Sequence, residues 1–545
     1  MIVTVASALA ATALTCAQMT GLRVPADEIG LPTRGAVVTA AELVPASGAA
    51  PKAVVEHCLV SGRISPADPA APDIQFRLAL PKNWNSKVLM FGGGGFDGSI
   101  PNVTGDVPNG APDQPNPLSR GYATFASDSG HQANALASQD GSFALNDEAA
   151  HNFGGDALKK TRDAATFLVK ARYGVDSIAK AYFAGGSTGG REALAAVTRW
   201  PKDWDGAIAW YPAWNDASAL LQGQRVNRAL ARTGAYPDSA KRALLYTAAM
   251  QACDALDGVS DGLISNPQRC NAVFDPATAS VDGHPLRCPE GADAGDSCLS
   301  DAQIAALQVM NTDSHFNFHL ASGETHYTGS NVWGADLGID KASPWQPLVK
   351  FLALGTSAPA TPMPRNSPYI GTLLDQWVKY SVARDAGFDS LSLDPENPGP
   401  WAKRLSELSI QLDTPVDLAG FAAKGGKLLL AHGVADILVS TRATEDYYQR
   451  LQARMGVPKV HEFVRYYEVP GFGHGVSTVF NAAWDSLTAL EMWTEKGTSP
   501  SAQVVTDTVG VPGRTRPLCD YPQWPRYGGS GDVDKASSFV CVATP

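Results

Sequence analysis

Short apolar runs alternate with amphipathic stretches in the two outer parts of the chain. Apolar runs bounded by glycine or proline predict buried strands, and apolar residues recurring every three or four positions predict helices. The predicted strands cover 73–81, 86–95, 179–185, 426–433 and 462–471, and the predicted helices cover 157–174, 191–200, 443–456 and 481–497. This alternation predicts an α/β fold, with a mostly parallel sheet covered by helices on both faces.

The alternation stops between residues 214 and 415, a region rich in proline, glycine, asparagine and tryptophan. An insertion before the strand at 426–433 would lie over the carboxyl ends of the strands, where open α/β sheets bind their ligands. We therefore expect an α/β-hydrolase core in two parts, residues 1–213 and 416–545, with a lid domain at 214–415 between them.

Composition narrows the class of function. The chain has 545 residues, of which 44% are hydrophobic and 18% charged, and a formal net charge of −11. Such a chain is not disordered, and it lacks the basic face of a nucleic-acid-binding protein. Residues 1–21 are apolar but lack a basic start and are too short to span a bilayer, so a remnant export signal and a first buried segment both stay open. We expect a monomer without nucleic-acid or membrane partners.

Eight cysteines, an even number in locally paired groups, indicate disulfide bonds. Their spacings differ from the C-x-x-C of zinc sites, and disulfides persist in oxidising compartments, so we expect a secreted or periplasmic protein. Sequence alone does not fix the connectivity. Proximity favours Cys253–Cys270, Cys288–Cys298 and Cys519–Cys541, which leaves Cys16 for Cys58.

Ser187 lies in the segment AYFAGGSTGGREAL, residues 181–194. Gly185 to Gly189 fit G-x-S-x-G, the sharp strand-to-helix turn that exposes a nucleophilic serine. Glycine is needed where Cβ atoms would collide at such a turn. A glycine-rich loop can match so short a pattern by chance, and it is the flanking strand and helix that favour the nucleophile.

A serine nucleophile needs a base and a group that orients the base, and in this fold they follow in the order serine, acid, histidine. Asp436 follows the predicted strand at 426–433, and His474 follows the one at 462–471. We predict that Ser187 attacks, that His474 accepts its proton and that Asp436 orients the imidazole. Asp436 could also be a plain turn residue. His432 precedes Asp436 and is better explained as a pocket or packing residue.

Two further motifs carry chemistry. The loop FGGGGFDG, residues 91–98, follows a strand as an oxyanion loop does, and its backbone can act together with the amide of Thr188. It could also be a flexible turn, whereas a phosphate-binding loop would need G-K-[ST].

Asp254, Asp257 and Asp261 place three carboxylates in one loop, which suits Ca²⁺ better than a polar turn because the carboxylates repel one another.

Together with the tail at 516–541, these motifs resemble the tannase and feruloyl esterase family of secreted serine esterases with an α/β-hydrolase core, a large lid and a structural lid calcium. The resemblance implies the triad and the disulfides given above. It also implies the amides of Gly95 and Thr188 as oxyanion hole, and the carbonyls of Val259 and Leu263 as calcium ligands beside the three aspartates.

The sequence departs from this family at Gly186 and Gly475. The family has cysteines directly before the nucleophile and directly after the histidine, and a disulfide between them ties the two loops. Both partners are absent together here, so we expect an active variant in which His474 is held less tightly against Ser187.

Substrate choice is expected to come from the lid. Its tryptophans suit a planar acyl group, and a guanidinium can clamp a free carboxylate. Arg365 and Tyr369 roughly match the arginine and the aromatic residue with which a terephthalate-hydrolysing member binds substrate, although Arg365 could be a plain surface residue. We expect a small aromatic ester, mono(2-hydroxyethyl) terephthalate ahead of feruloyl or galloyl esters. A catalytically silent, calcium-bound binding protein is the alternative of another class.

Overall fold

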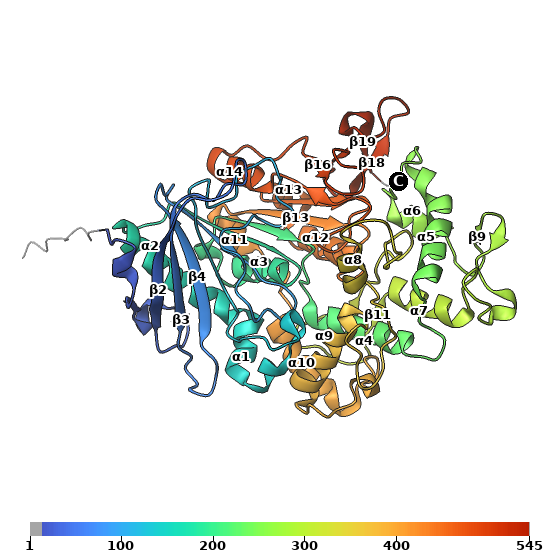
Figure 1. The fold of residues 1–545 in the computed structure, drawn as a ribbon, viewed down its shortest axis with the longest axis horizontal. Helices are drawn as coiled ribbons and strands as arrows, with labels where there is room; N and C mark the ends of the chain where they lie inside the picture. Colours follow the sequence, from blue (N-terminus) through green and yellow to red (C-terminus); the bar gives the residue numbers. More distant parts are fainter. Residues whose placement is uncertain (1–12, 544–545) are drawn as a thin grey trace, which may run out of the picture.

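The computed structural model describes residues 13–543, so the part of the apolar N-terminal stretch before residue 13 lies outside the described residues. A ten-stranded sheet has the order β1-β2-β3-β4-β6-β5-β7-β8-β13-β14 (Figure 1). Its strands are β1 (Arg23–Val24), β2 (Ala36–Val44), β3 (His57–Ile64), β4 (Ile74–Pro81), β5 (Lys87–Phe91), β6 (Ala123–Ser127), β7 (Lys180–Gly186), β8 (Gly206–Trp210), β13 (Lys427–Gly433) and β14 (Val464–Val469).

The sheet is mixed. Strands β6, β5, β7, β8, β13 and β14 pair in parallel, whereas β1 to β4 pair antiparallel, as do β4 and β6. The α/β class and all five predicted strands are confirmed. Strands β2 and β3 and the antiparallel pairing were not predicted, because these two strands mix small and polar residues and show no continuous apolar run.

Each face of the sheet packs against helices, and the strand period of two decides which side chain enters which core. Leu428 and Leu430 of β13 lie in one hydrophobic cluster, with residues of α2 (Ala157–Tyr173), α3 (Thr188–Arg199) and α12 (Thr441–Met455). Leu429 lies in the other cluster, with residues of α14 (Ser486–Lys496). The sequence therefore reads as continuous apolar runs because both faces are buried.

One predicted helix begins later than expected. Helix α14 starts at Ser486, not at 481, because the Asp485 carboxylate caps it by accepting from the Thr488 amide at 3.2 Å. Ala482 and Ala483 form strand β15 (Ala482–Ala483), which pairs with β16 (Val504–Asp507), and β17 (Thr515–Pro517) completes this small sheet. The apolar residues at 481–485 thus belong to a strand and a cap.

Residues 211–426 connect β8 to β13, which are neighbours in the sheet, so this long segment is an insertion between two paired strands. One hydrophobic cluster lies within the insertion, and a second joins it to Phe96 and Phe153 of the core. Figure 1 shows α5, α6 and α7 beyond the end of the sheet. The helices of the insertion are α4 (Asp216–Leu230), α5 (Ser239–Cys253), α6 (Pro267–Val273), α7 (Asp301–Asn311), α8 (Gln346–Leu352), α9 (Tyr369–Gln376), α10 (Ala402–Leu412) and α11 (Ala419–Lys424).

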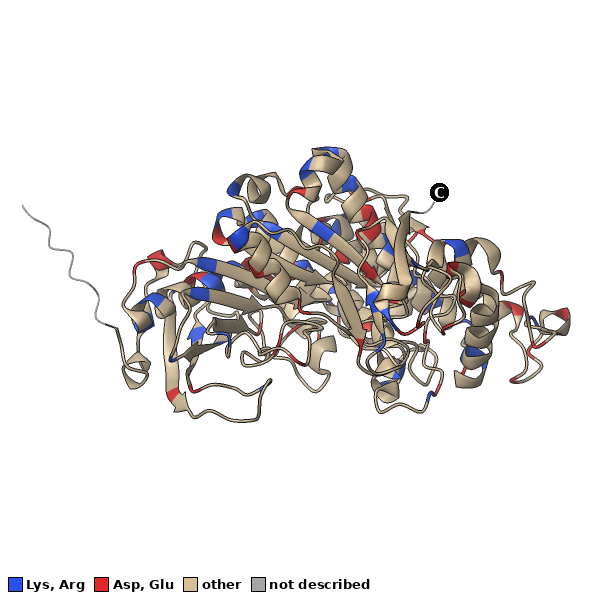
Figure 2. Cartoon of the chain, turned by 90° about the horizontal axis from the view of Figure 1, so that it is seen from above, with Lys and Arg blue, Asp and Glu red and all other residues tan. Residues whose placement is uncertain are grey.

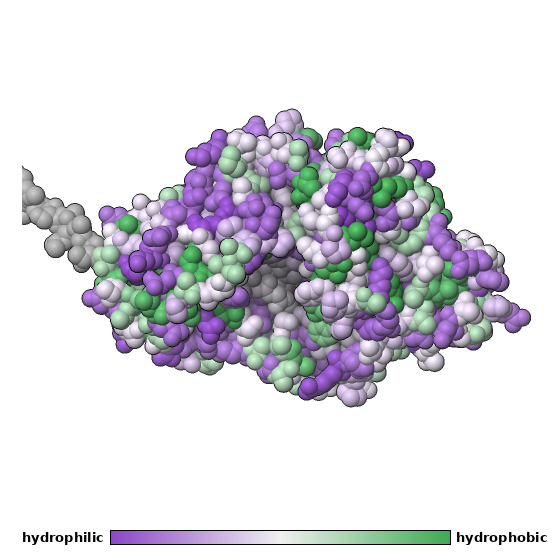
Figure 3. Space-filling model, turned by 45° about the horizontal axis from the view of Figure 1, so that its top comes forward, coloured by the Kyte–Doolittle hydropathy of each residue, from purple (hydrophilic) through white to green (hydrophobic). Residues whose placement is uncertain are grey.

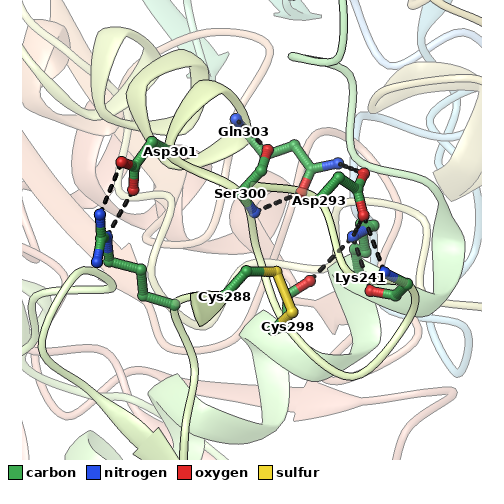
Figure 4. Close-up of a disulfide and its surroundings, with 9 residues drawn as sticks. Lys241, Cys288, Asp293, Cys298, Ser300, Asp301 and Gln303 are labelled. Atoms are coloured by element: carbon green, nitrogen blue, oxygen red, sulfur yellow. Dashed lines mark hydrogen bonds and ion pairs between the residues drawn. A yellow bond between two sulfur atoms is a disulfide. The ribbon is translucent and has the colours of Figure 1, made fainter. Parts of the chain in front are cut away.

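All eight cysteines form disulfides, and the pairing predicted from proximity is confirmed. The Cys288–Cys298 bond closes a loop of the insertion that a buried lysine also holds (Figure 4). The Lys241 ammonium donates to the Asp293 carboxylate at 2.9 Å and to the carbonyl of Cys298 at 2.9 Å. The buried charge of Lys241 is thereby paired with a carboxylate that is itself about half exposed.

The outer surface carries both signs of charge. Figure 2 shows acidic and basic residues interspersed over the helices and loops. The face in Figure 3 mixes polar residues with small separate apolar patches and is hollowed near its middle. Between residues 13 and 543, no helix combines the length and the apolar character needed to cross a membrane.

Candidate active site

Ser187 lies at the turn between β7 and α3, and its backbone is strained. Its φ of 62° lies in the left-handed region, which non-glycine residues rarely adopt, and its amide donates to the Trp210 carbonyl at 3.0 Å. A Cβ on Gly185 would lie 2.1 Å from the Gly189 carbonyl oxygen, and one on Gly189 would lie 2.7 Å from the Gly93 carbonyl oxygen. The glycines of the motif are therefore required by close backbone approach.

The three residues predicted as a triad lie within hydrogen-bonding distance of one another. His474 Nε2 is 2.9 Å from Ser187 Oγ, and His474 Nδ1 is 2.7 Å from Asp436 Oδ2. Asp436 follows β13 and His474 follows β14, so the parallel strands bring both to the edge of the sheet where β7 ends. This arrangement allows proton transfer from the serine to the imidazole.

The Asp436 carboxylate is fully buried, and its environment keeps it charged. Burial alone would raise its pKa, but the charges and hydrogen bonds of His474 and His432 outweigh burial and hold the pKa of Asp436 well below its usual range. The amides of Leu438 and Val439 donate to its other oxygen at 2.9 and 3.0 Å. The negative charge beside His474 Nδ1 therefore persists throughout the neutral pH range.

His432 is a second histidine on the same carboxylate. Its Nε2 lies 3.2 Å from Asp436 Oδ2, and its Nδ1 lies 2.9 Å from Thr444 Oγ1. It is fully buried behind the carboxylate. The sequence interpretation of His432 therefore missed its hydrogen bond to Asp436, because only the folded loop brings the two side chains together.

Gly95 and Thr188 lie side by side at the turn. Gly95 has a φ of 60°, and the Thr188 hydroxyl donates to its carbonyl at 2.7 Å. Throughout residues 13–543, neither the Gly95 amide nor the Thr188 amide donates to a protein acceptor. Two free amides beside a serine hydroxyl are what an oxyanion hole requires.

Two buried carboxyl groups hold the glycine loop that leads to Gly95, and sequence reasoning missed both. Glu192 accepts from the Gly93 amide at 2.8 Å, and Asp97 accepts from the Gly94 amide at 2.7 Å. Burial first, and then the charge of Glu192, raise the pKa of Asp97 well above its usual range. Their positions in the sequence could have revealed them. Asp97 lies inside the glycine-rich loop, and Glu192 lies in the first turns of the helix that follows Ser187.

An apolar cavity lies beside His474, between the core loops and the insertion. The cavity is small and partly open to solvent. Ile437, Leu438 and Val476 line it from the core, and Val349 and Leu352 line it from the insertion. Such a lining suits an apolar or aromatic group of a ligand next to the reacting atoms.

The two predicted substrate-binding residues differ in their surroundings. Tyr369 is buried, its hydroxyl lies 3.1 Å from Ser138 Oγ, and a Cβ on Gly95 would lie 2.4 Å from that hydroxyl. Arg365 is exposed and does not line the cavity beside His474. The structure thus brings Tyr369 to the predicted oxyanion site and leaves Arg365 at the surface of the insertion.

In the predicted calcium loop, the three carboxylates lie near one another but do not point to one common metal position. Burial first, and then the charges of Asp261 and Asp254, raise the pKa of Asp257 to about 6, and Asp257 Oδ2 is buried without a partner. Asp254 instead accepts from the Leu263 amide at 3.2 Å, and Asp261 forms an ion pair with Arg516. As arranged, the described residues include no group of three acidic, histidine or cysteine side chains placed to hold a metal ion.

The sheet order, the Ser187 turn and the loops that follow β13 and β14 define an α/β-hydrolase. The sequence profile described as "Tannase and feruloyl esterase" matches residues 58–542. The chain therefore belongs to the tannase and feruloyl esterase family and is a carboxylic-ester hydrolase.

Relatives agree with this assignment, and a solved structure shares the fold. The chain is 38% identical to an uncharacterized esterase of Agrobacterium fabrum, covering 97% of this chain and 93% of that protein. It is 32% identical to the mono(2-hydroxyethyl) terephthalate hydrolase of Piscinibacter sakaiensis, covering 92% and 87%. The fold resembles the crystal structure of feruloyl esterase B from Aspergillus oryzae, with a TM-score of 0.74, 21% identity and coverage of 95% and 98%.

Proposed function

We propose that this esterase hydrolyses mono(2-hydroxyethyl) terephthalate to terephthalate and ethylene glycol. The observation that carries the chemistry is the run of hydrogen bonds from Asp436 through His474 to Ser187, which ends beside an apolar cavity. The choice of ester is supported by the 32% identity, over 92% of this chain, to a hydrolase of that name.

Ser187 Oγ attacks the ester carbonyl carbon while His474 Nε2 takes its proton. The negative oxygen of the tetrahedral intermediate accepts from the amides of Gly95 and Thr188, and the intermediate collapses as His474 returns the proton to the departing alcohol. Water then attacks the acyl-enzyme through the same histidine, which releases the acid and restores the serine. Asp436 keeps the imidazole in the required tautomer throughout.

We also propose that the insertion acts as a lid and that its loop at 254–263 binds structural Ca²⁺. The Asp254, Asp257 and Asp261 carboxylates, with the carbonyls of Val259 and Leu263, form an oxygen donor set of the kind that Ca²⁺ prefers. The unpartnered oxygen of Asp257 supports a cation there. Four disulfides favour maturation in an oxidising compartment, so we propose export from the cytoplasm.

The test measures product release by chromatography from mono(2-hydroxyethyl) terephthalate, methyl ferulate and methyl gallate. Wild type should release terephthalate, and Ser187→Ala should release none. Release from ferulate or gallate alone would refute the terephthalate assignment. If no ester reacts and a serine-directed phosphonate fails to label Ser187, the protein is a binding protein.

The carboxylate clamp has its own control. If Arg365 binds the free carboxylate, Arg365→Ala should raise KM for the monoester about tenfold or more, the cost of a charged hydrogen bond. The same substitution should leave KM for bis(2-hydroxyethyl) terephthalate unchanged, because that ester has no free carboxylate. Arg232→Ala removes another exposed arginine of the insertion and should affect neither ester. Equal effects of Arg365→Ala on both esters would exclude the clamp.

A further inference from the structure

Tyr211, the first residue after β8, lies between the loops that carry Ser187 and His474. It is buried, its ring centroid is 4.8 Å from that of His474, and the two rings are tilted by 58°. Its amide donates to the Ala431 carbonyl of β13 at 2.7 Å. The ring thus stands at the junction of β8, the nucleophile turn and the histidine loop.

The ring fills the space between two glycines. A Cβ on Gly186 would lie 2.6 Å from the Tyr211 hydroxyl and 2.7 Å from its ring, and a Cβ on Gly475 would lie 3.3 Å from that hydroxyl. A larger side chain at position 186 would therefore displace the ring. Gly186, Gly475 and Tyr211 form one packing unit, in which the absence of two side chains makes room for a third.

The conformation of Tyr211 is itself unusual. Its φ of 35° lies in the left-handed region, where a bulky residue is a rare outlier. Its hydroxyl donates to Asn109 Oδ1 at 3.3 Å, and its ring also contacts Phe472 at a centroid distance of 6.2 Å. Strained residues of this kind persist where the surroundings hold them, and they gather at active sites.

We propose that Tyr211 is a positioning residue for His474, which it holds against Ser187 by packing in the absence of a covalent tie between the two loops. This inference rests on the proposed esterase mechanism. The imidazole must stay within hydrogen-bonding distance of the serine in each step. A ring packed against the imidazole restricts the orientations in which it cannot react with the serine. The expectation of a loosely held His474, drawn from Gly186 and Gly475 alone, overlooked this ring.

The test measures kcat, KM and melting temperature, with kcat expressed per active serine titrated with a phosphonate. Tyr211→Ala should lower kcat about tenfold or more, with KM within about twofold, because binding groups are unchanged while the imidazole gains freedom. Tyr211→Phe keeps the ring and should retain most of kcat. A merely structural role would lower the melting temperature and the titrated fraction but not kcat per titrated site.

Gly186→Ala provides a second route to the same ring. In wild type the added methyl group must displace Tyr211, so kcat should fall, whereas in the Tyr211→Ala protein the same methyl group enters free space and should cause no further loss. Strict additivity of the two changes, or a wild-type kcat per titrated site in Tyr211→Ala, would overturn the proposal.

If Tyr211→Ala does not fold, Gly186→Ala and Tyr211→Phe decide the matter. A wild-type kcat in Gly186→Ala, or a loss in Tyr211→Phe as large as in Gly186→Ala, would again overturn it. Failure of the wild type to label at Ser187 would refute the esterase mechanism itself, and that outcome is distinct from every outcome for Tyr211.

Discussion

Two buried aspartates of opposite electrostatic character allow the role of Asp436 to be tested sharply. Asp436 is held charged by its histidines. Asp413 is also buried, and there burial raises the pKa to about 8, which favours its neutral form at neutral pH. Replacing Asp436 by asparagine removes a negative charge, whereas replacing Asp413 by asparagine changes the charge little.

The size of the effect follows from the structure. When His474 takes the serine proton, its positive charge lies next to the Asp436 carboxylate, since Nδ1 and Oδ2 are 2.7 Å apart. Two charges about 4 Å apart interact by about 4 kcal/mol at an effective dielectric constant of about 20. At about 1.4 kcal/mol for each factor of ten, Asp436→Asn should lower kcat roughly a thousandfold, and the wrong imidazole tautomer should add to this loss.

The assay is hydrolysis of a 4-nitrophenyl ester at neutral pH by wild type, Asp436→Asn and Asp413→Asn. An amide at 413 can still accept from the Ala217 amide and can donate to the Ser322 hydroxyl, which lie 2.9 and 2.7 Å from the present oxygens. Its kcat should stay within about twofold of wild type. More than a tenth of wild-type kcat in Asp436→Asn, or an equal loss in both variants, would refute the reasoning.

The same pair predicts opposite dependence of stability on pH. The folded-state pKa of Asp413 is raised, so its contribution to stability is lost as pH rises toward about 8. The folded-state pKa of Asp436 is lowered, so its contribution is present above the unfolded value near 4 and is lost only as pH falls below it. Asp413→Asn should therefore reduce the fall in wild-type melting temperature between weakly acidic pH and pH 8 or above, and an unchanged slope would contradict this.

Three further predictions concern the turn, the glycine loop and the cation. Gly185→Ala should lower the free energy of unfolding in urea by more than about 3 kcal/mol, because its Cβ would lie 2.1 Å from a backbone oxygen. The control Gly387→Ala adds one ordinary contact and should lower that free energy by less than about 0.5 kcal/mol. Asp97→Asn should keep kcat within about fivefold, because burial and the charge of Glu192 raise the pKa of Asp97 and an amide oxygen can still accept from the Gly94 amide. Asp97→Ala removes that acceptor and should lower kcat more than about tenfold. Chelation of Ca²⁺ should lower the melting temperature by several degrees in wild type but not in Asp257→Asn, and an unchanged wild-type value would dismiss the calcium proposal.

Much of the site could be predicted from the sequence because its signals are local. Gly185 and Gly189 mark the turn, and Asp436 and His474 each follow a strand that the pattern of apolar residues reveals. Parallel strands place their carboxyl ends at one edge, so the order of these residues along the chain is enough to bring them together. The four disulfides were likewise predictable, because three of them close short loops.

Other features depend on the tertiary structure. The antiparallel pairing of β2 and β3, the hydrogen bond of His432 to Asp436 and the carboxyl groups beneath the glycine loop each join residues whose contact no spacing announces. The sequence by itself determined the fold class, the esterase family and the candidate triad, since these depend on local periodicity and short motifs. Only the folded chain decided that the ring of Tyr211 fills the space beside two glycines, because close packing depends on which distant side chains compete for the same volume.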